Sequence, residues 1–187
     1  MKKKLIFSAA LVLSLGLAAC GEEKTKEEPQ KEETQTPVSA DKTDKEEKSE
    51  DVYFKDNEAK LVDLKMNITE TKVIQPGEKG NEYGDKPVFA IWYNTTNLSD
   101  KELDPISAWM VVFTAIQDNN PNSVNELEVA PLPDERFLDT QIETIKKDGT
   151  VENAVGYILD DLETPVTLVA NQGLGGKELG KQDYDVK

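Results

Sequence analysis

The sequence predicts an all-β protein, an antiparallel β-sandwich or barrel that follows a non-globular N-terminal region. Two observations lead to this fold class. Residues 52–187 contain six to eight short β-rich runs separated by turn signals, without an amphipathic helical pattern of ten residues. The residues before position 52 are either continuously apolar or highly charged, so they cannot contribute to a packed core. We therefore place the folded domain at residues 52–187.

The β-rich runs differ in the burial that they predict. In residues 62–68, apolar and polar side chains alternate, as in a strand with one face on the core. Residues 88–96 are apolar on both faces, which predicts a central strand whose Trp92 packs in the core. Further strands are expected at 109–116, 142–145, 151–159 and 165–170, with a last edge strand at 184–186.

Two long connections separate these runs. Residues 75–86 contain one proline and three glycines and predict a turn region. Residues 119–139 form a long irregular loop, which is the strongest candidate for a binding surface because long ordered loops are usually functional. Its apolar side chains must either cover the sandwich or contact a partner, and both alternatives remain open: Leu127, Val129, Pro131, Leu132, Pro133, Phe137 and Leu138.

The first residues have the pattern of an export signal. Three lysines at positions 2–4 precede an apolar run at 5–15, which is shorter than the roughly 20 residues needed to span a bilayer. Leu17-Ala18-Ala19-Cys20, followed by Gly21, resembles the lipobox of bacterial lipoproteins. The resemblance implies removal of residues 1–19 and a diacylglyceryl group on Cys20. The alternative is an ordinary secretory signal followed by a chance cysteine.

Residues 20–51 are expected to be a disordered charged linker. Residues 21–51 contain twelve acidic residues and six lysines, with no aromatic residue. Such a composition buries too little apolar area to offset the entropy of ordering. An isolated helix is the alternative, although Pro29 and Pro37 weaken it.

Composition excludes several kinds of chemistry. The chain has no histidine, one cysteine and a net charge of −15. A histidine-based catalytic pair and an intrachain disulfide are therefore impossible, and nucleic acid, which needs a basic surface, is not an expected partner. We expect no enzyme, no catalytic residue and no cofactor.

Acidic and amide side chains leave two weaker alternatives. Asp160, Asp161 and Glu163 could act as paired carboxylates, although acidic residues are common in turns. Calcium could bind the oxygens clustered near two turns, although their spacing matches no EF-hand and we expect no metal site: Asp118, Asn119, Asn120, Asn122, Asp134 and Asp139.

Several short motifs of residues 52–170 also resemble a known family. They are the strand end Tyr93-Asn-Thr-Thr-Asn97, the turn Lys146-Lys-Asp-Gly-Thr150 and the strand Tyr157-Ile-Leu-Asp160. The sequence is similar to an immunoglobulin-like domain of unknown function found on lipoproteins of low-GC Gram-positive bacteria. The resemblance implies an extracellular, non-enzymatic sandwich and carries over no functional residue.

Together these features predict a lipoprotein on the extracellular face of the bacterial cell membrane. The membrane would be reached through the lipid on Cys20, and a protein of the envelope or the exterior is the expected partner. The leading hypothesis is a binding module, and the alternative is a structural or envelope-stress lipoprotein without a specific ligand.

Overall fold

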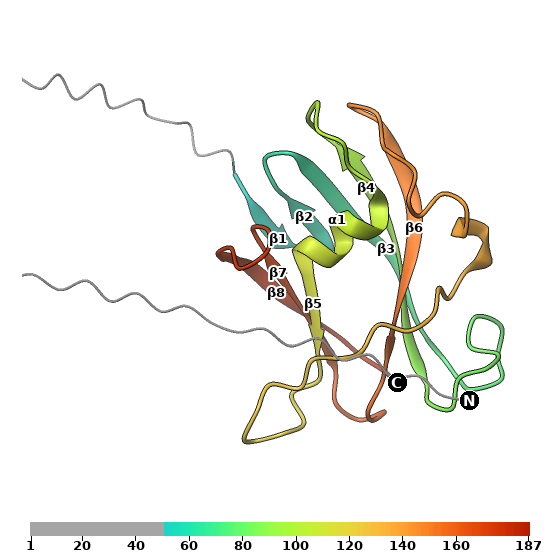
Figure 1. Ribbon diagram of the computed structural model, residues 1–187. Coiled ribbons are helices and arrows are strands. Elements are labelled where there is room, and N and C mark those ends of the chain that lie inside the picture. Colours follow the sequence, from blue (N-terminus) through green and yellow to red (C-terminus); the bar gives the residue numbers. More distant parts are fainter. Residues whose placement is uncertain (1–50) are drawn as a thin grey trace, which may run out of the picture. The chain divides into compact units, whose positions relative to one another are not determined.

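The computed structural model describes residues 51–187, which form two antiparallel β-sheets and one short α-helix (Figure 1). The five-stranded sheet has the order β1-β2-β3-β4-β6, with bounds Tyr53–Lys55, Glu58–Lys60, Leu64–Ile74, Val88–Asn97 and Thr150–Ile158. The three-stranded sheet has the order β5-β7-β8, with bounds Phe113–Ile116, Val166–Asn171 and Glu178–Tyr184. The all-β fold class with two antiparallel sheets is confirmed. The predicted signal peptide, Cys20 and the linker lie outside the described residues.

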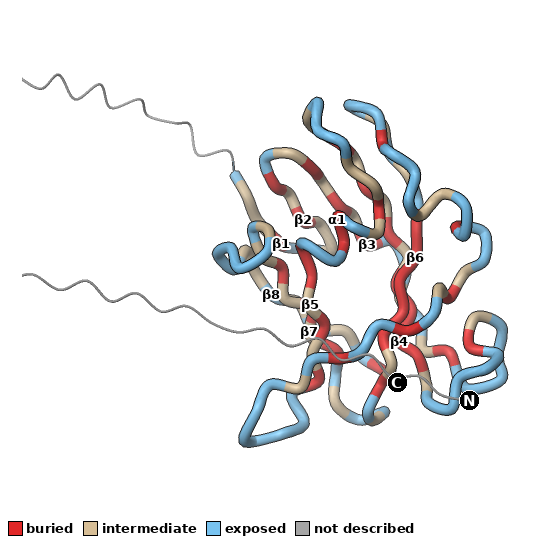
Figure 2. Tube along the Cα trace, viewed as in Figure 1, coloured by how far each residue is buried: buried red, intermediate tan, exposed pale blue. Residues whose placement is uncertain are grey.

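The core lies between the two sheets, where the buried residues face one another (Figure 2). Its centre is aromatic: the Trp109 ring lies 4.3 Å from that of Tyr93 and 4.4 Å from that of Phe113. The Trp109 indole N–H donates a 2.7 Å hydrogen bond to the Tyr157 hydroxyl, and burial raises the pKa of Tyr157 to about 12. The expectation that Trp92 is the core tryptophan is wrong, because Trp109 occupies that place.

A helix replaces most of the strand predicted at 109–116. Helix α1 (Pro105–Val112) precedes β5, which keeps only the last four residues of the predicted strand. The Asp104 side chain caps the helix by accepting from the Ser107 N–H at 2.8 Å, and Pro105 suits the first helical turn. The prediction failed because the aromatic and β-branched residues of this run favour a strand in the absence of tertiary contacts.

Three smaller predictions also differ from the structure. Residues 142–145 form no strand, and the last edge strand lies at 178–184 instead of 184–186. Strands β1 and β2 were not predicted because each has only three residues. They form a hairpin whose central residues Asp56 and Asn57 have φ values of 51° and 66°, as a type I′ turn requires.

A bulge in β3 changes which side chains face the core. Leu64, Met66 and Ile68 are buried as predicted, whereas Val62 precedes the strand and is 53% exposed. The pairing with β4 shifts between Ile68 and Glu70. Since successive side chains alternate between faces, this extra residue directs Glu70 outward, where it pairs with Trp92.

The loop at 119–139 connects the two sheets along their edges. The Leu127 N–H donates to the Ala115 carbonyl of β5 at 2.9 Å, whereas the Ala130 N–H donates to the Gly156 carbonyl of β6 at 2.8 Å. Segment 125–130 therefore pairs first with the three-stranded sheet and then with the five-stranded sheet. Buried Leu127, Ala130, Pro133 and Phe137 cover the domain, while Val124, Val129 and Leu138 are exposed.

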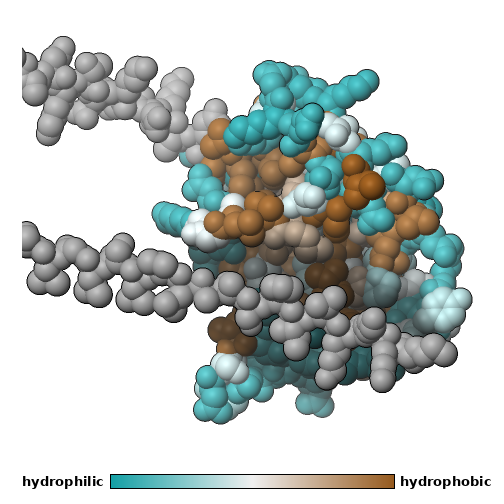
Figure 3. All heavy atoms as spheres, viewed as in Figure 1, coloured by the Kyte–Doolittle hydropathy of each residue, from teal (hydrophilic) through white to brown (hydrophobic). Residues whose placement is uncertain are grey.

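Apolar side chains also gather on the face of the molecule that carries α1 (Figure 3). Met110 and Val111 of this helix are exposed, although four of its eight residues are buried. None of the helices in residues 51–187 has the length and the apolar character needed to cross a membrane.

Candidate functional site

A groove runs over the outer face of the five-stranded sheet, on the side of β4 that faces away from the core. It consists of two cavities of about 200 and 350 Å³ that share Glu70, Trp92 and Arg136. We call this surface the Trp92 groove. Its other charged lining residues are Lys72 from β3, Glu152 from β6, and Lys79 and Asp134 from the loops. The uncharged polar residues that line it are Thr69, Tyr93, Asn94 and Asn153.

The sheet positions the floor of the groove. Trp92 pairs with Glu70 of β3 on one side and with Ala154 of β6 on the other. These three residues share the outer face because directly opposed residues of paired strands point the same way. The bulge described above is needed for this arrangement, since without it Glu70 would face the core.

The wall of the groove is a short 3-10 helix, η1 (Glu135–Phe137), and the residue before it. Asp134 begins this helix, and its carboxylate accepts from the Arg136 backbone N–H at 3.1 Å. The same carboxylate accepts the Trp92 indole N–H at 2.8 Å and three further hydrogen bonds from the Nε and Nη2 atoms of the Arg136 guanidinium. Trp92, Asp134 and Arg136 thus hold one another in place.

Electrostatics of this trio favour the ionised carboxylate. Hydrogen bonds from Arg136, followed by the one from Trp92, hold the pKa of Asp134 well below its usual range. The Arg136 guanidinium also lies 5.1 Å from the centre of the Phe137 ring, within the range of a cation–π contact. Its side chain is nevertheless 70% exposed, so the guanidinium remains accessible from solvent.

The charges around the groove balance. Three acidic and three basic side chains line the two cavities: Glu70, Asp134, Glu152, Lys72, Lys79 and Arg136. The whole chain, in contrast, carries a net charge of −15. The Trp92 groove is therefore a locally neutral surface on an acidic protein.

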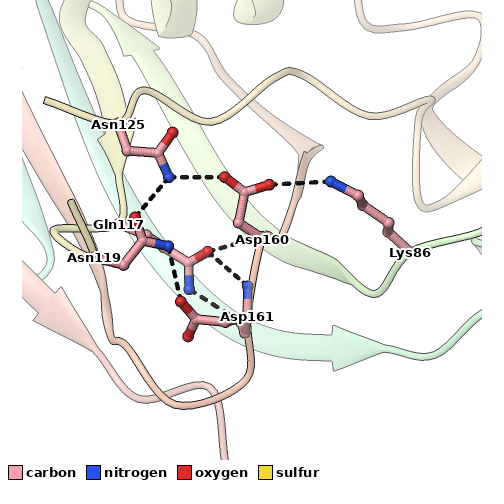
Figure 4. Close-up of polar contacts among 6 residues, drawn as sticks. All are labelled: Lys86, Gln117, Asn119, Asn125, Asp160 and Asp161. Carbon is pink, nitrogen blue, oxygen red and sulfur yellow. Dashed lines mark hydrogen bonds and ion pairs between the residues drawn. The ribbon is translucent and has the colours of Figure 1, made fainter. Parts of the chain in front are cut away.

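Asp160 and Asp161, which the sequence singled out as paired carboxylates, lie elsewhere, in a polar cluster between loops (Figure 4). The cluster consists of Lys86, Gln117, Asn119, Asn125, Asp160 and Asp161. The Asp160 carboxylate accepts from Asn125 at 2.8 Å and from Lys86 at 3.1 Å. These two bonds, with Asn125 as the larger cause, lower the pKa of Asp160.

Asp161 and Gln117 complete this polar cluster. The Asp161 carboxylate accepts backbone N–H groups of Thr164 and Glu163 and the Asn119 amide, which together lower its pKa to about 2. The fully buried Gln117 side chain donates to the Asp161 and Thr164 carbonyls and accepts the Asp160 N–H at 2.9 Å. Protein donors thus surround the carboxylates, and the cluster joins the β6–β7 turn to the loop after β5.

The oxygens considered for calcium are distributed over separate places. Asn119 and Asn120 accept hydrogen bonds from Asn125 and from the Asn122 backbone, whereas Asp134 lies in the Trp92 groove. Asp118 and Asp139 are exposed, and Glu163 contributes its backbone N–H to the Asp161 carboxylate. Within residues 51–187, no three acidic or cysteine side chains gather in an arrangement that could hold a metal ion.

The Trp92 groove was missed from the sequence, although one signal pointed to it. Arg136 is the only arginine among the 22 basic residues of the chain, and it lies inside the loop singled out as a binding surface. Trp92 was assigned to the core because its run is apolar on both faces. The register of β4 with β3 and β6 places Trp92 on the outer face of the sheet, and this register cannot be read from the run itself.

Comparisons with known proteins inform both the fold and the family. No curated protein matches the chain. One solved structure, described as a "putative lipoprotein" of Staphylococcus aureus, is similar with a TM-score of 0.61 and 20% sequence identity, over 73% of this chain and 92% of that one. At this identity the likeness concerns the fold. The model of the family named Domain of unknown function (DUF5067) matches residues 39–172, and the chain belongs to this family.

Proposed function

We propose that this protein is a lipid-anchored extracellular lipoprotein whose folded domain binds a ligand in the Trp92 groove and catalyses no reaction. The anchor is supported by the lipobox-like sequence that ends at Cys20 and by the fold shared with a protein described as a lipoprotein. The binding role is supported by one observation above all. A tryptophan and the sole arginine of the chain line an open groove in which both are held by Asp134.

Binding explains these side chains better than catalysis does. The most strongly perturbed carboxylate of the groove, Asp134, is kept ionised by Arg136 and Trp92, which makes it a poor proton donor or acceptor near neutral pH. Its hydrogen bonds orient the Trp92 indole and the Arg136 guanidinium instead. Pre-positioned aromatic and guanidinium groups lower the entropy cost of binding a partner.

The anchor is tested by replacing Cys20 with serine. We expect wild-type protein to fractionate with membranes and to incorporate labelled palmitate, because two acyl chains are needed for stable attachment. C20S should lose the label and appear in the medium or as unprocessed precursor. Unchanged membrane fractionation of C20S would contradict the anchored assignment.

The groove is tested by measuring retention of the protein on isolated cell envelopes stripped of their own lipoproteins. We expect W92A to be retained less than the wild type. The matched control is Y83A, which removes a fully exposed aromatic side chain outside the groove. Equal retention of wild type, W92A and Y83A would contradict the binding role and favour a structural lipoprotein without a specific ligand.

A further inference from the structure

The geometry points to a neutral oligosaccharide as the ligand of the Trp92 groove. This inference rests on the proposed binding function and narrows it to one class of ligand. Four observations support it. The main-chain groups below the groove are already paired, aromatic and polar side chains line the groove, the charges of these side chains balance, and the groove is divided into two cavities.

The floor of the groove offers side chains but no main-chain hydrogen bonds. Trp92 lies on β4, which is paired with β3 on one side and β6 on the other, and segment 128–130 pairs with the far edge of β6. The backbone N–H and C=O groups below the groove are therefore used within the sheet. An extended peptide is usually recognised through such groups at a free strand edge, so this surface does not suit one.

The groove combines the aromatic ring of Trp92 in its floor with planar polar groups. The C–H groups on the face of a pyranose ring are weakly positive and are attracted to the negative face of an indole. Sugar hydroxyls then need hydrogen-bonding partners at the edge of that ring. Glu70, Glu152 and Asn94 line the smaller cavity together with Trp92 and provide two carboxylates and an amide. Arg136 lines both cavities.

The balance of charge argues for a neutral ligand. Three acidic and three basic side chains line the groove, so it offers a cation or an anion little net attraction. The acidic chain as a whole, with its net charge of −15, repels a polyanion. An uncharged polar molecule needs no net charge in the groove and is not repelled by the acidic chain.

The two cavities suggest more than one sugar ring. Trp92, Glu70 and Arg136 line both cavities, so they stand between a smaller space near Glu152 and a larger one near Lys79. A chain of two or more rings would use both spaces and contact the shared residues in the middle. A single sugar would fill only one of them and bind more weakly.

The test is calorimetric titration of full-length protein in detergent with oligomers of β-1,4-linked N-acetylglucosamine, and with glucose and mannose oligomers, from one to six rings. We expect a neutral oligomer to bind, and we expect oligomers of two or more rings to bind more tightly than the single sugar. W92A should weaken this binding about tenfold, while Y83A should leave it unchanged. Deacetylated, cationic oligomers of the same length should bind more weakly than the neutral ones.

Failure of this inference can be distinguished from failure of the proposed function. If no neutral oligomer binds, or if W92A binds as tightly as the wild type, the saccharide assignment is overturned. If envelope retention still depends on Trp92 in that case, the groove binds a ligand of another class. Loss of retention after the envelopes are digested with glycan hydrolases would instead support the saccharide assignment.

Discussion

The Trp92 indole N–H and the Asp134 carboxylate are joined by a 2.8 Å hydrogen bond that connects strand β4 to the loop beginning η1. Asp134 is mostly buried, and it also accepts from the Arg136 backbone and side chain. One carboxylate thus fixes the tryptophan and the arginine of the groove at the same time. Its removal should release both.

We therefore expect D134A to lower the free energy of unfolding by about 1–2 kcal/mol, because it removes a helix cap and a charge-assisted hydrogen bond. Urea denaturation measures this loss. Acrylamide should quench the variant's fluorescence more strongly, since Trp92 becomes mobile while Trp109 stays buried. E135A, which changes an exposed neighbour in η1, is the control. Unchanged quenching of D134A would show that Asp134 does not hold Trp92.

The stability contributed by Asp161 should depend on pH. Its pKa is lowered from 3.8 to about 2, first by the Thr164 backbone and then by Asn119, so folding favours the ionised form. The contribution is therefore complete above pH 4 to 5 and is lost as the pH falls towards about 2. D161A should melt at a lower temperature than the wild type at pH 7, and the difference should shrink at pH 2.

The control for this experiment is D118A, which removes an exposed carboxylate near the same loop. We expect its melting temperature to match that of the wild type. A difference between D161A and wild type that is equal at pH 7 and pH 2 would mean that Asp161 does not act through its charge.

Replacing Gln117 by leucine should be strongly destabilising. The buried side chain bonds to two carbonyls and to the Asp160 N–H, so Q117L leaves these half-buried groups without their partner and places an apolar side chain against them. We expect a loss of about 3 kcal/mol in urea denaturation. Q172L, at an exposed turn position, should change stability by less than about 0.5 kcal/mol. A Q117L protein as stable as Q172L would exclude a structural role for the polar cluster.

Gly156 should not tolerate a larger residue, because the loop passes directly over it. A Cβ atom there would lie 2.9 Å from a Val88 methyl carbon and 3.1 Å from the Ala130 Cβ. G156A should therefore lose about 1–3 kcal/mol from overpacking. In the double variant G156A/V88A, the loss should be smaller than the sum of the two single losses. Strict additivity in thermal or urea unfolding would contradict this contact.

The strands that the sequence predicted correctly are those with local patterns. Residues 88–97 are rich in β-forming side chains almost throughout, and residues 150–158 have them at both ends, so their strand preference needs little help from distant contacts. The helix at Pro105–Val112 was missed because its local start signal, Asp104 followed by a proline, competes with the strand-forming residues after it. Burial of Trp109 against Tyr93 and Phe113 decides the competition in favour of the helix.

The groove could not be predicted because it depends on contacts between distant segments. Glu70 faces Trp92 only because β3 has a bulge, and Asp134 reaches Trp92 only because segment 125–130 leads the loop across β6. Neither relationship follows from the spacing of residues along the chain. The 119–139 loop was singled out as the strongest candidate for a binding surface. In the structure its buried apolar residues cover the sandwich, while Asp134 and Arg136 line the Trp92 groove.

The pairing of segment 125–130 has a consequence for the behaviour of many copies of the protein. An unpaired strand edge is a template on which another chain can add, and both β5 and β6 would present such an edge without this segment. In the anchored state proposed above, copies of the protein would share a thin layer of space, where neighbours meet far more often than in dilute solution. By occupying one edge of each sheet, this short stretch of chain prevents a neighbouring copy from adding a strand to β5 or β6, while β1 and β8 remain the outer strands at the opposite ends of the sheets.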